Sequence, residues 1–217
     1  MIEKNISLVE IADVLKSKQK LLIICHVRPD GDTLACAYAL KEALTPMGKE
    51  VICVSSDRAS DRLSFLCDTP LLTPNEIPSG FCPDLVVTVD VAGRSMLGDA
   101  EHLLSLAPSV KIDHHVGNDC FADYYYIKSD SASCAEIIFD LLEDLCPMNK
   151  KICELLYAGI CFDTGCFMHS NVSATTLNKA SKLLECGINA SDINRRLFGN
   201  KTQKEIAALK LAYNSLE

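Results

Sequence analysis

Three short polar segments combine histidine and aspartate side chains in spacings that suit a metal site. They are residues 26–32 (His-Val-Arg-Pro-Asp-Gly-Asp), Asp90, and residues 113–115 (Asp-His-His). Imidazole and carboxylate ligands without thiolate spacing favour Mn²⁺ and related divalent ions over a closed structural zinc site. Two such ions about 3.5–4 Å apart can hold a phosphoryl group and activate a water molecule. The residue types therefore predict a two-metal site that hydrolyses phosphate esters.

We expect these three segments to meet in space because each follows a predicted strand. Residues 21–25, 84–89 and 110–112 are short runs rich in apolar and β-branched side chains. In an open parallel sheet the carboxyl ends of the strands form one rim, and ligands bind there. Carboxylates gathered so closely are unfavourable unless they are protonated or bound to cations.

Simpler interpretations apply to each segment taken alone. A single aspartate after a strand, such as Asp90, is usually a helix cap or a turn residue, and His114-His115 could lie in a surface loop. The spacing of His26, Asp30 and Asp32 after an apolar strand is more specific. Three such segments at three strand ends together favour the metal site.

Other polar residues are weaker candidates for the same rim. Asp163 lies in a glycine-containing segment that implies tight backbone passage, although it could equally be a turn residue. His169 could contact substrate or have a structural role. Arg94 and Arg28 are candidate partners for a phosphate. No G-x-S-x-G, G-x-x-x-x-G-K-[ST] or G-x-G-x-x-G motif occurs, which removes the main support for serine hydrolases, P-loop proteins and dinucleotide-binding domains.

The alternation of short β-rich runs with longer helical patterns predicts an α/β domain with a mostly parallel central sheet flanked by helices, followed by a helical C-terminal segment. A loop is expected at 69–83, and Gly48 should end a helix. Ser133 with Glu136 and Thr202 with Glu205 have capping-box spacing. The expected strands are 21–25, 50–54, 84–89 and 110–112, and the expected helices are 8–15, 33–47, 95–106 and those that begin near 133, 149, 174, 191 and 202.

Composition narrows the location and the partners of the protein. The chain of 217 residues suits one domain and carries a net charge of −8, which argues against binding long duplex nucleic acid. A small anionic substrate remains compatible because bound cations can reverse the local field. We find no apolar run of the roughly 20 residues that a membrane span needs and no signal-peptide core, so we expect a cytoplasmic protein without a membrane partner.

Twelve cysteines are scattered along the chain without any Cys-x-x-Cys pair. In a cytoplasmic protein this pattern favours reduced, mostly buried thiols over a disulfide framework or a zinc ribbon.

Four ordered segments resemble the motifs of the DHH phosphoesterases, most closely the branch of oligoribonucleases and 3'-phosphoadenosine 5'-phosphate phosphatases. Residues 26–32 are similar to the first motif, 89–90 to the second, 113–115 to the third and 159–165 to the fourth. The resemblance covers nearly the whole chain. It implies a DHH catalytic domain over residues 1–200 with two Mn²⁺ ions, or Mg²⁺ or Co²⁺ in their place.

The resemblance also implies two metal sites that share the carboxylate of Asp90. His115 would bind the phosphate or protonate the leaving group, and Asp113 would orient its neighbours from behind. Ser133, just before a helix, would help to hold phosphate. The implied metal ligands are His26, Asp30 and Asp90 for one ion, and Asp32, Asp90, His114 and Asp163 for the other.

The implied substrates are short single-stranded RNA or DNA, 3'-phosphoadenosine 5'-phosphate or cyclic dinucleotides, and a homodimer is left open. Proteins of this kind usually continue into a second domain that grips substrate, and residues 201–217 would begin a linker helix toward it. One alternative is a manganese-dependent inorganic pyrophosphatase. The loop at 69–83 and the form of the first and fourth motifs argue against it. Another alternative is a nucleotide-binding regulatory module without turnover.

Overall fold

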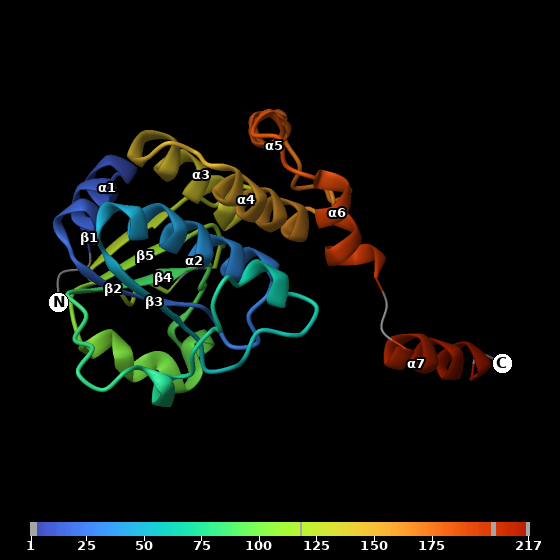
Figure 1. The fold of residues 1–217 in the computed structure, drawn as a ribbon, viewed down its shortest axis with the longest axis horizontal. Helices are drawn as coiled ribbons and strands as arrows, with labels where there is room; N and C mark the ends of the chain where they lie inside the picture. Colours follow the sequence, from blue (N-terminus) through green and yellow to red (C-terminus); the bar gives the residue numbers. More distant parts are fainter. Residues whose placement is uncertain (1–3, 118, 201–202, 216–217) are drawn as a thin grey trace.

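Six parallel strands form one sheet in the computed structural model, which describes residues 4–117, 119–200 and 203–215 (Figure 1). The strands are β1 (Lys4–Asn5), β2 (Lys20–Ile24), β3 (Glu50–Val54), β4 (Leu85–Val89), β5 (Ser109–Asp113) and β6 (Tyr124–Ile127). Their order across the sheet is β1-β6-β5-β4-β2-β3, and every neighbouring pair is parallel. The predicted α/β class is therefore confirmed.

Helical segments cover both faces of the sheet, with α1 to α4 on one side and η4 on the other (Figure 1). The side chains of β2 alternate accordingly, as Leu21 and Ile23 join the larger core while Leu22 and Ile24 pack with Leu97 of η4. The helical segments of five or more residues are α1 (Leu8–Ser17), α2 (Gly31–Leu44), η4 (Arg94–Ser105), α3 (Cys134–Leu145), α4 (Lys150–Asp163), α5 (Ala174–Glu185), α6 (Ala190–Asn194), η5 (Arg195–Gly199) and α7 (Gln203–Asn214).

The strand order places a switch point beside β2. The chain leaves β2 for β3 on one side and returns to β4 on the other. The loops that follow β2 and β4 therefore lead to opposite faces of the sheet, and ligands bind at the carboxyl edge beside such a switch point.

Helix α2 begins two residues earlier than the sequence pattern predicted, because Asp30 caps it. The carboxylate oxygen Oδ1 of Asp30 accepts hydrogen bonds from the amides of Asp32 (2.9 Å) and Thr33 (3.1 Å). The helix ends at Leu44, and Gly48 then adopts a left-handed φ of 80°, as expected for a stop. The cap therefore fixes Asp30 and Asp32 on the first turn of the most buried helix.

Two strands and one helix type differ from the sequence-based prediction. Strand β6, which lies between β1 and β5, was missed because all four of its residues are half-buried, so it shows no apolar alternation, and the edge strand β1 has only two residues. The segment expected as a helix at 95–106 is a 3-10 segment with a break at Gly98 (φ 53°). A Cβ at Gly98 would lie 2.6 Å from Val27 Cγ1, so the break lets this segment pack closely against the loop after β2.

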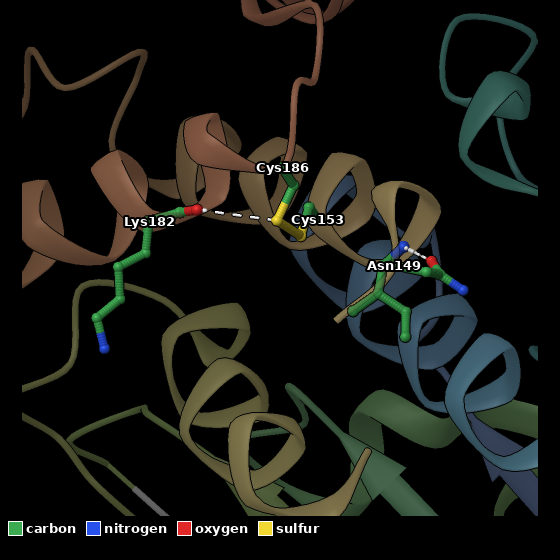
Figure 2. The surroundings of a disulfide bond; sticks show 5 residues. Asn149, Cys153, Lys182 and Cys186 are labelled. Atoms are coloured by element: carbon green, nitrogen blue, oxygen red, sulfur yellow. Dashed lines mark hydrogen bonds between the residues drawn. A yellow bond between two sulfur atoms is a disulfide. The ribbon is translucent and has the colours of Figure 1, made fainter. Parts of the chain in front are cut away.

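The expectation that all cysteines are reduced is wrong for one pair. Cys153 of α4 and Cys186, just beyond α5, form a disulfide (Figure 2). The two residues meet because α5 packs along α4, a contact between positions 33 apart that no local cysteine spacing reveals. The other ten cysteines are free. Five of them are buried, namely Cys25, Cys36, Cys53, Cys134 and Cys161.

The last described helix, α7, extends away from the sheet and its described residues are exposed (Figure 1). The capping box predicted at Thr202 and Glu205 lies outside what the structure describes. Whether residues 201–217 form a linker stays a prediction. Across the described ranges, no helix has both the length and the apolar character that crossing a bilayer requires.

The close packing of α2, α3 and α4 makes Gly159 a sensitive position. A Cβ there would lie 2.7 Å from Ala135 Cβ and 2.7 Å from Asp32 Oδ1. We expect Gly159→Ala to lower the free energy of unfolding by about 1–3 kcal/mol, the usual cost of overpacking, and to weaken metal binding by displacing Asp32. Chemical unfolding and manganese titration would measure both effects. Gly117→Ala, with nothing within 4 Å, is the matched control, and equal stability of the two variants would contradict the prediction.

Candidate metal centre

Asp90 lies between two groups of histidine and aspartate side chains at the carboxyl edge of the sheet. In the first group, His26 Nε2 lies 3.5 Å from Asp30 Oδ1 and 3.7 Å from Asp90 Oδ2. His26 Nδ1 is 2.7 Å from the carbonyl oxygen of Val27. A proton on Nδ1 donated to this carbonyl leaves the Nε2 lone pair directed at the carboxylates.

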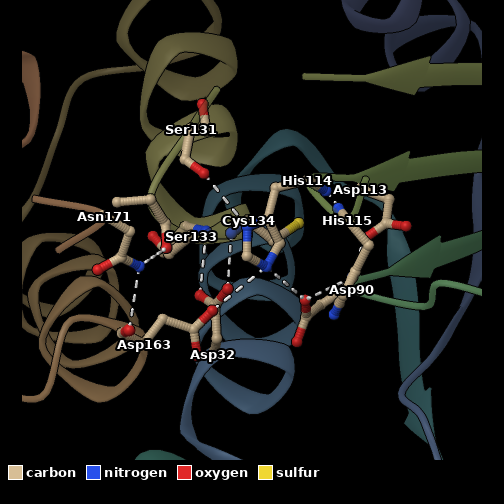
Figure 3. Close-up of polar contacts among 12 residues, drawn as sticks. Asp32, Asp90, Asp113, His114, His115, Ser131, Ser133, Cys134, Asp163 and Asn171 are labelled. Carbon is tan, nitrogen blue, oxygen red and sulfur yellow. Dashed lines mark hydrogen bonds and ion pairs between the residues drawn. The ribbon is translucent and has the colours of Figure 1, made fainter. Parts of the chain in front are cut away.

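The second group is built around His114, which follows β5 (Figure 3). Its Nε2 lies 3.3 Å from Asp90 Oδ1 and 3.2 Å from Asp163 Oδ2. Its Nδ1 lies 3.3 Å from the carbonyl oxygen of Ser131, which fixes the ring in the same way as for His26. Asp163 is the last residue of α4, so three separate elements deliver the ligands of this group.

Asp32 completes the second group and is held by the N-terminus of α3. The amides of Cys134 and Ala135 donate to its two carboxylate oxygens at 2.6 Å and 3.0 Å. Backbone amides at a helix N-terminus favour a negative charge. The carboxylate of Asp32 is nevertheless completely buried, so it needs a further positive partner.

The backbone and side chain of Asp90 both indicate a functional constraint. Asp90 has φ 58°, a left-handed conformation that non-glycine residues seldom adopt and that clusters at functional sites. Its Oδ1 is buried and, although 3.3 Å from His114 Nε2, makes no well-aligned hydrogen bond. Buried acceptors are normally satisfied. A cation between the two groups would satisfy this one.

Raised pKa values of buried aspartates and of two histidines offset the negative charge of the cluster when no ion is bound. Burial, followed by the charges of neighbouring carboxylates, raises the pKa of Asp32 and of Asp90. Burial alone would lower the pKa of His114, but its contacts with Asp163 and Asp90 raise it to about 12. Burial also lowers the pKa of His26, but its hydrogen bond to Asp30 outweighs this and raises the pKa to about 9. The cluster thus demands positive charge in its centre.

The ligand atoms are close enough to share ions. They lie within 4.8 Å of one another in each of three overlapping sets, all of which contain Asp90, and one of these sets joins Asp90 to His114 and His115. Because the donors are oxygens and imidazole nitrogens, the cluster fits divalent metal ions. The other two sets have the same members as those that the family resemblance implied, namely His26, Asp30 and Asp90, and Asp32, Asp90, His114 and Asp163.

His115 and Asp113 form a pair at the side of the cluster (Figure 3). Asp113 is fully buried, and its Oδ1 lies 2.7 Å from His115 Nδ1. The same oxygen accepts a hydrogen bond of 2.8 Å from the His114 amide. The hydrogen bond to Asp113 raises the pKa of His115, which favours its protonated form. His115 Nδ1 also lies 3.8 Å from Asp90 Oδ1.

The structure does not bring the three predicted substrate contacts into this cluster. Ser133 is buried, and its hydroxyl caps α3 by accepting from the Glu136 amide. Arg94 pairs with Glu101 and lines a separate cavity of about 870 Å³ that contains no residue of the cluster. His169 is exposed, and its Nδ1 lies 3.2 Å from the Asp163 carbonyl oxygen, so it supports the turn after α4.

Asn171 is a positioning residue that sequence reasoning missed. Its Nδ2 donates to the carbonyl oxygens of Asp163 (3.2 Å) and Ala132 (3.0 Å), which joins the end of α4 to the segment before α3. The turn that leads from Asp163 to Asn171 has left-handed φ values at Gly165, Cys166 and Phe167. Only Gly165 gives a sequence signal for this turn.

A parallel sheet flanked by helices, with a buried Asp/His cluster at its carboxyl edge, defines an α/β domain whose site fits divalent metal ions. Residues 20–160 match the model of the DHH family, N-terminal domain, so the chain belongs to the DHH family.

Two curated relatives carry related names. The bifunctional oligoribonuclease and PAP phosphatase NrnA of Bacillus subtilis (strain 168) is 32% identical over 182 residues, which cover 81% of this chain and 56% of the relative. A probable bifunctional oligoribonuclease and PAP phosphatase NrnA of Streptococcus mutans is 28% identical and covers 84% and 58%. The chain therefore spans little more than half the length of these relatives.

The fold is also that of a solved structure, an exopolyphosphatase-related protein from Bacteroides fragilis. The two share a TM-score of 0.88 at 19% identity, over 96% of this chain and 64% of the other.

The raised histidine pKa values predict that metal affinity rises with pH. The ordinary pKa of His26 is 6.5 and its folded value is about 9, so its charge stabilises the metal-free protein below pH 6.5 and this contribution is lost as the pH rises through 9. Manganese must displace that proton. Calorimetric titration between pH 6.5 and 9 should show affinity that rises by up to about tenfold per pH unit for each proton released. The exposed His102→Asn control should keep this slope, and a flat profile would contradict the prediction.

Proposed function

We propose that this domain hydrolyses phosphate esters of short oligonucleotides or small nucleotides at a pair of manganese ions. The observation that carries the proposal is the sharing of Asp90 between two ligand sets. Support also comes from membership of the DHH family and from the names of relatives that cover most of this chain.

The chain's own residues would position the substrate and move the protons. When bound, the ions supply charge that stabilises the phosphate and promotes ionisation of the attacking water. Asp30 and Asp32 are fixed by helix termini, which holds the two ligand sets rigidly before substrate arrives. Asp113 pairs with Nδ1 of His115 and favours its protonated form. His115 would donate its Nε2 proton to the leaving oxygen.

A manganese-dependent pyrophosphatase remains the alternative within the enzyme class, since such an enzyme could use a similar cluster. A nucleotide-binding module without turnover is the alternative in another class, but the Asp113–His115 pair has no use there. Parallel assays with pyrophosphate, 3'-phosphoadenosine 5'-phosphate, cyclic di-AMP and RNA of two to five nucleotides separate these activities. Bound nucleotide with no product after long incubation in Mn²⁺ would favour the binding module.

Removing the shared ligand tests the proposal directly. We expect Asp90→Ala to abolish manganese-dependent hydrolysis because both ligand sets lose a member. The folded state should persist, since the variant also relieves a buried carboxylate. Hydrolysis of a dinucleotide would be followed by chromatography, with the exposed Asp13→Ala as the matched control. Full activity in Asp90→Ala would refute the two-ion mechanism.

Asp113 should act through His115 and not on the substrate itself. Asp113→Asn removes the charge that raises the pKa of His115, so the alkaline limb of the kcat profile should move to lower pH. We expect kcat to fall by roughly 10- to 100-fold, as for other residues that orient a ligand or an acid. A kcat that falls with no movement of the pH profile would assign Asp113 a purely structural role.

A further inference from the structure

An aromatic side chain forms one wall of the Asp/His cluster. Phe162 directly precedes the proposed ligand Asp163, and its ring packs on Gly31, which lies between Asp30 and Asp32. The contact is so close that a Cβ on Gly31 would lie 2.4 Å from Phe162 Cδ2. Glycine at this position therefore lets an aromatic ring sit directly against the turn that carries two of the proposed ligands.

A second ring continues this wall outward. Phe198 stacks on Phe162 with ring centroids 6.1 Å apart and planes 27° from parallel. Phe198 nevertheless remains 38% exposed, whereas its neighbour Leu197 is fully buried and anchors the segment. The rings thus lead from the buried ligands to solvent.

The segment that carries Phe198 has an unusual backbone. Residues Arg195–Gly199 form a π-helical turn, closed by a hydrogen bond of 2.9 Å from the Asn200 amide to the Arg195 carbonyl oxygen. Single π-helical turns are rare and occur often at functional sites.

An arginine from a distant loop completes the surface. Arg62 donates a hydrogen bond to the Leu197 carbonyl oxygen, and its guanidinium carbon lies 6.0 Å from the centre of the Phe198 ring. Arg62 as a whole is exposed. An exposed flat ring beside a planar cation is the combination on which nucleobases stack in single-stranded nucleic-acid sites.

We propose that Phe198, supported by Phe162 and Arg62, binds one nucleobase of the substrate whose phosphate lies at the Asp/His cluster. This inference rests on the proposed function, because the cluster would hold the phosphate through its bound ions and His115 and has no group placed for the base. Stacking does not depend on base identity. The surface therefore selects nucleotides over phosphate esters without a base, and it does so without sequence preference.

The test compares a dinucleotide with its fully abasic counterpart, using the 217-residue chain with Mn²⁺. The wild type should show a KM for the dinucleotide roughly 5- to 150-fold below that for the abasic substrate, the range for one stacked base. Phe198→Leu should raise the dinucleotide KM toward the abasic value with kcat and the abasic KM unchanged. Phe198→Trp should retain the preference. Tyr213→Leu, which removes an exposed aromatic ring of α7, is the matched control and should behave as the wild type.

The outcomes separate the two proposals. If the wild type hydrolyses neither substrate, the proposed function fails and the base site fails with it. If it hydrolyses both with equal KM, the ester chemistry stands and the base site is refuted, a result that needs no variant to fold. A Phe198→Leu protein with a wild-type unfolding temperature and an unchanged dinucleotide KM would also refute the base site.

Discussion

The crowding of four carboxylates at one edge of the sheet is the constraint on which the rest of this structure depends. These carboxylates surround two histidines, and Asp32 and Asp90 are almost completely buried. The four are Asp30, Asp32, Asp90 and Asp163. Without a counter-charge such a group is unfavourable, and the raised pKa values of Asp32 and Asp90 express that cost. Divalent ions are the simplest way to offset it.

The fold supplies the rigid supports that keep the carboxylates in place. Two helix N-termini do most of this, since α2 begins on Asp30 and α3 donates two amides to Asp32. The left-handed backbone of Asp90 adds local strain, which the surrounding sheet must hold. Close contact at Gly159 leaves no room for relaxation behind Asp32. Stability and site geometry are therefore linked through the same contacts.

The sequence predicted the parts of the site that depend on strand ends. Because parallel strands bring their carboxyl ends together, the polar residues after β2, β4 and β5 could be placed at one edge from local pattern alone. Residues positioned by tertiary packing could not be found in this way. Asn171 is placed by a turn with three left-handed residues, and Phe198 is placed by stacking on Phe162 of a distant helix.

The same limit bears on the predicted substrate contacts and on the cysteines. Only the family resemblance made Ser133 a candidate for holding phosphate, and its buried hydroxyl caps α3, in agreement with its predicted capping spacing to Glu136. Arg94 follows a ligand in sequence, yet η4 carries it toward a different cavity. The disulfide between Cys153 and Cys186 depends on the packing of α5 on α4. The disulfide and the direction of Arg94 depend on how the elements pack, whereas the Ser133 cap is local and follows from residue spacing.

The most direct measurement of the central claim is anomalous diffraction from crystals grown with Mn²⁺. Two bound ions that share Asp90 should give two peaks about 3.5–4 Å apart, one beside His26 and Asp30 and the other beside Asp32, His114 and Asp163. A single peak that leaves either ligand set empty, or no peak at all, would contradict the account of a cluster balanced by two ions.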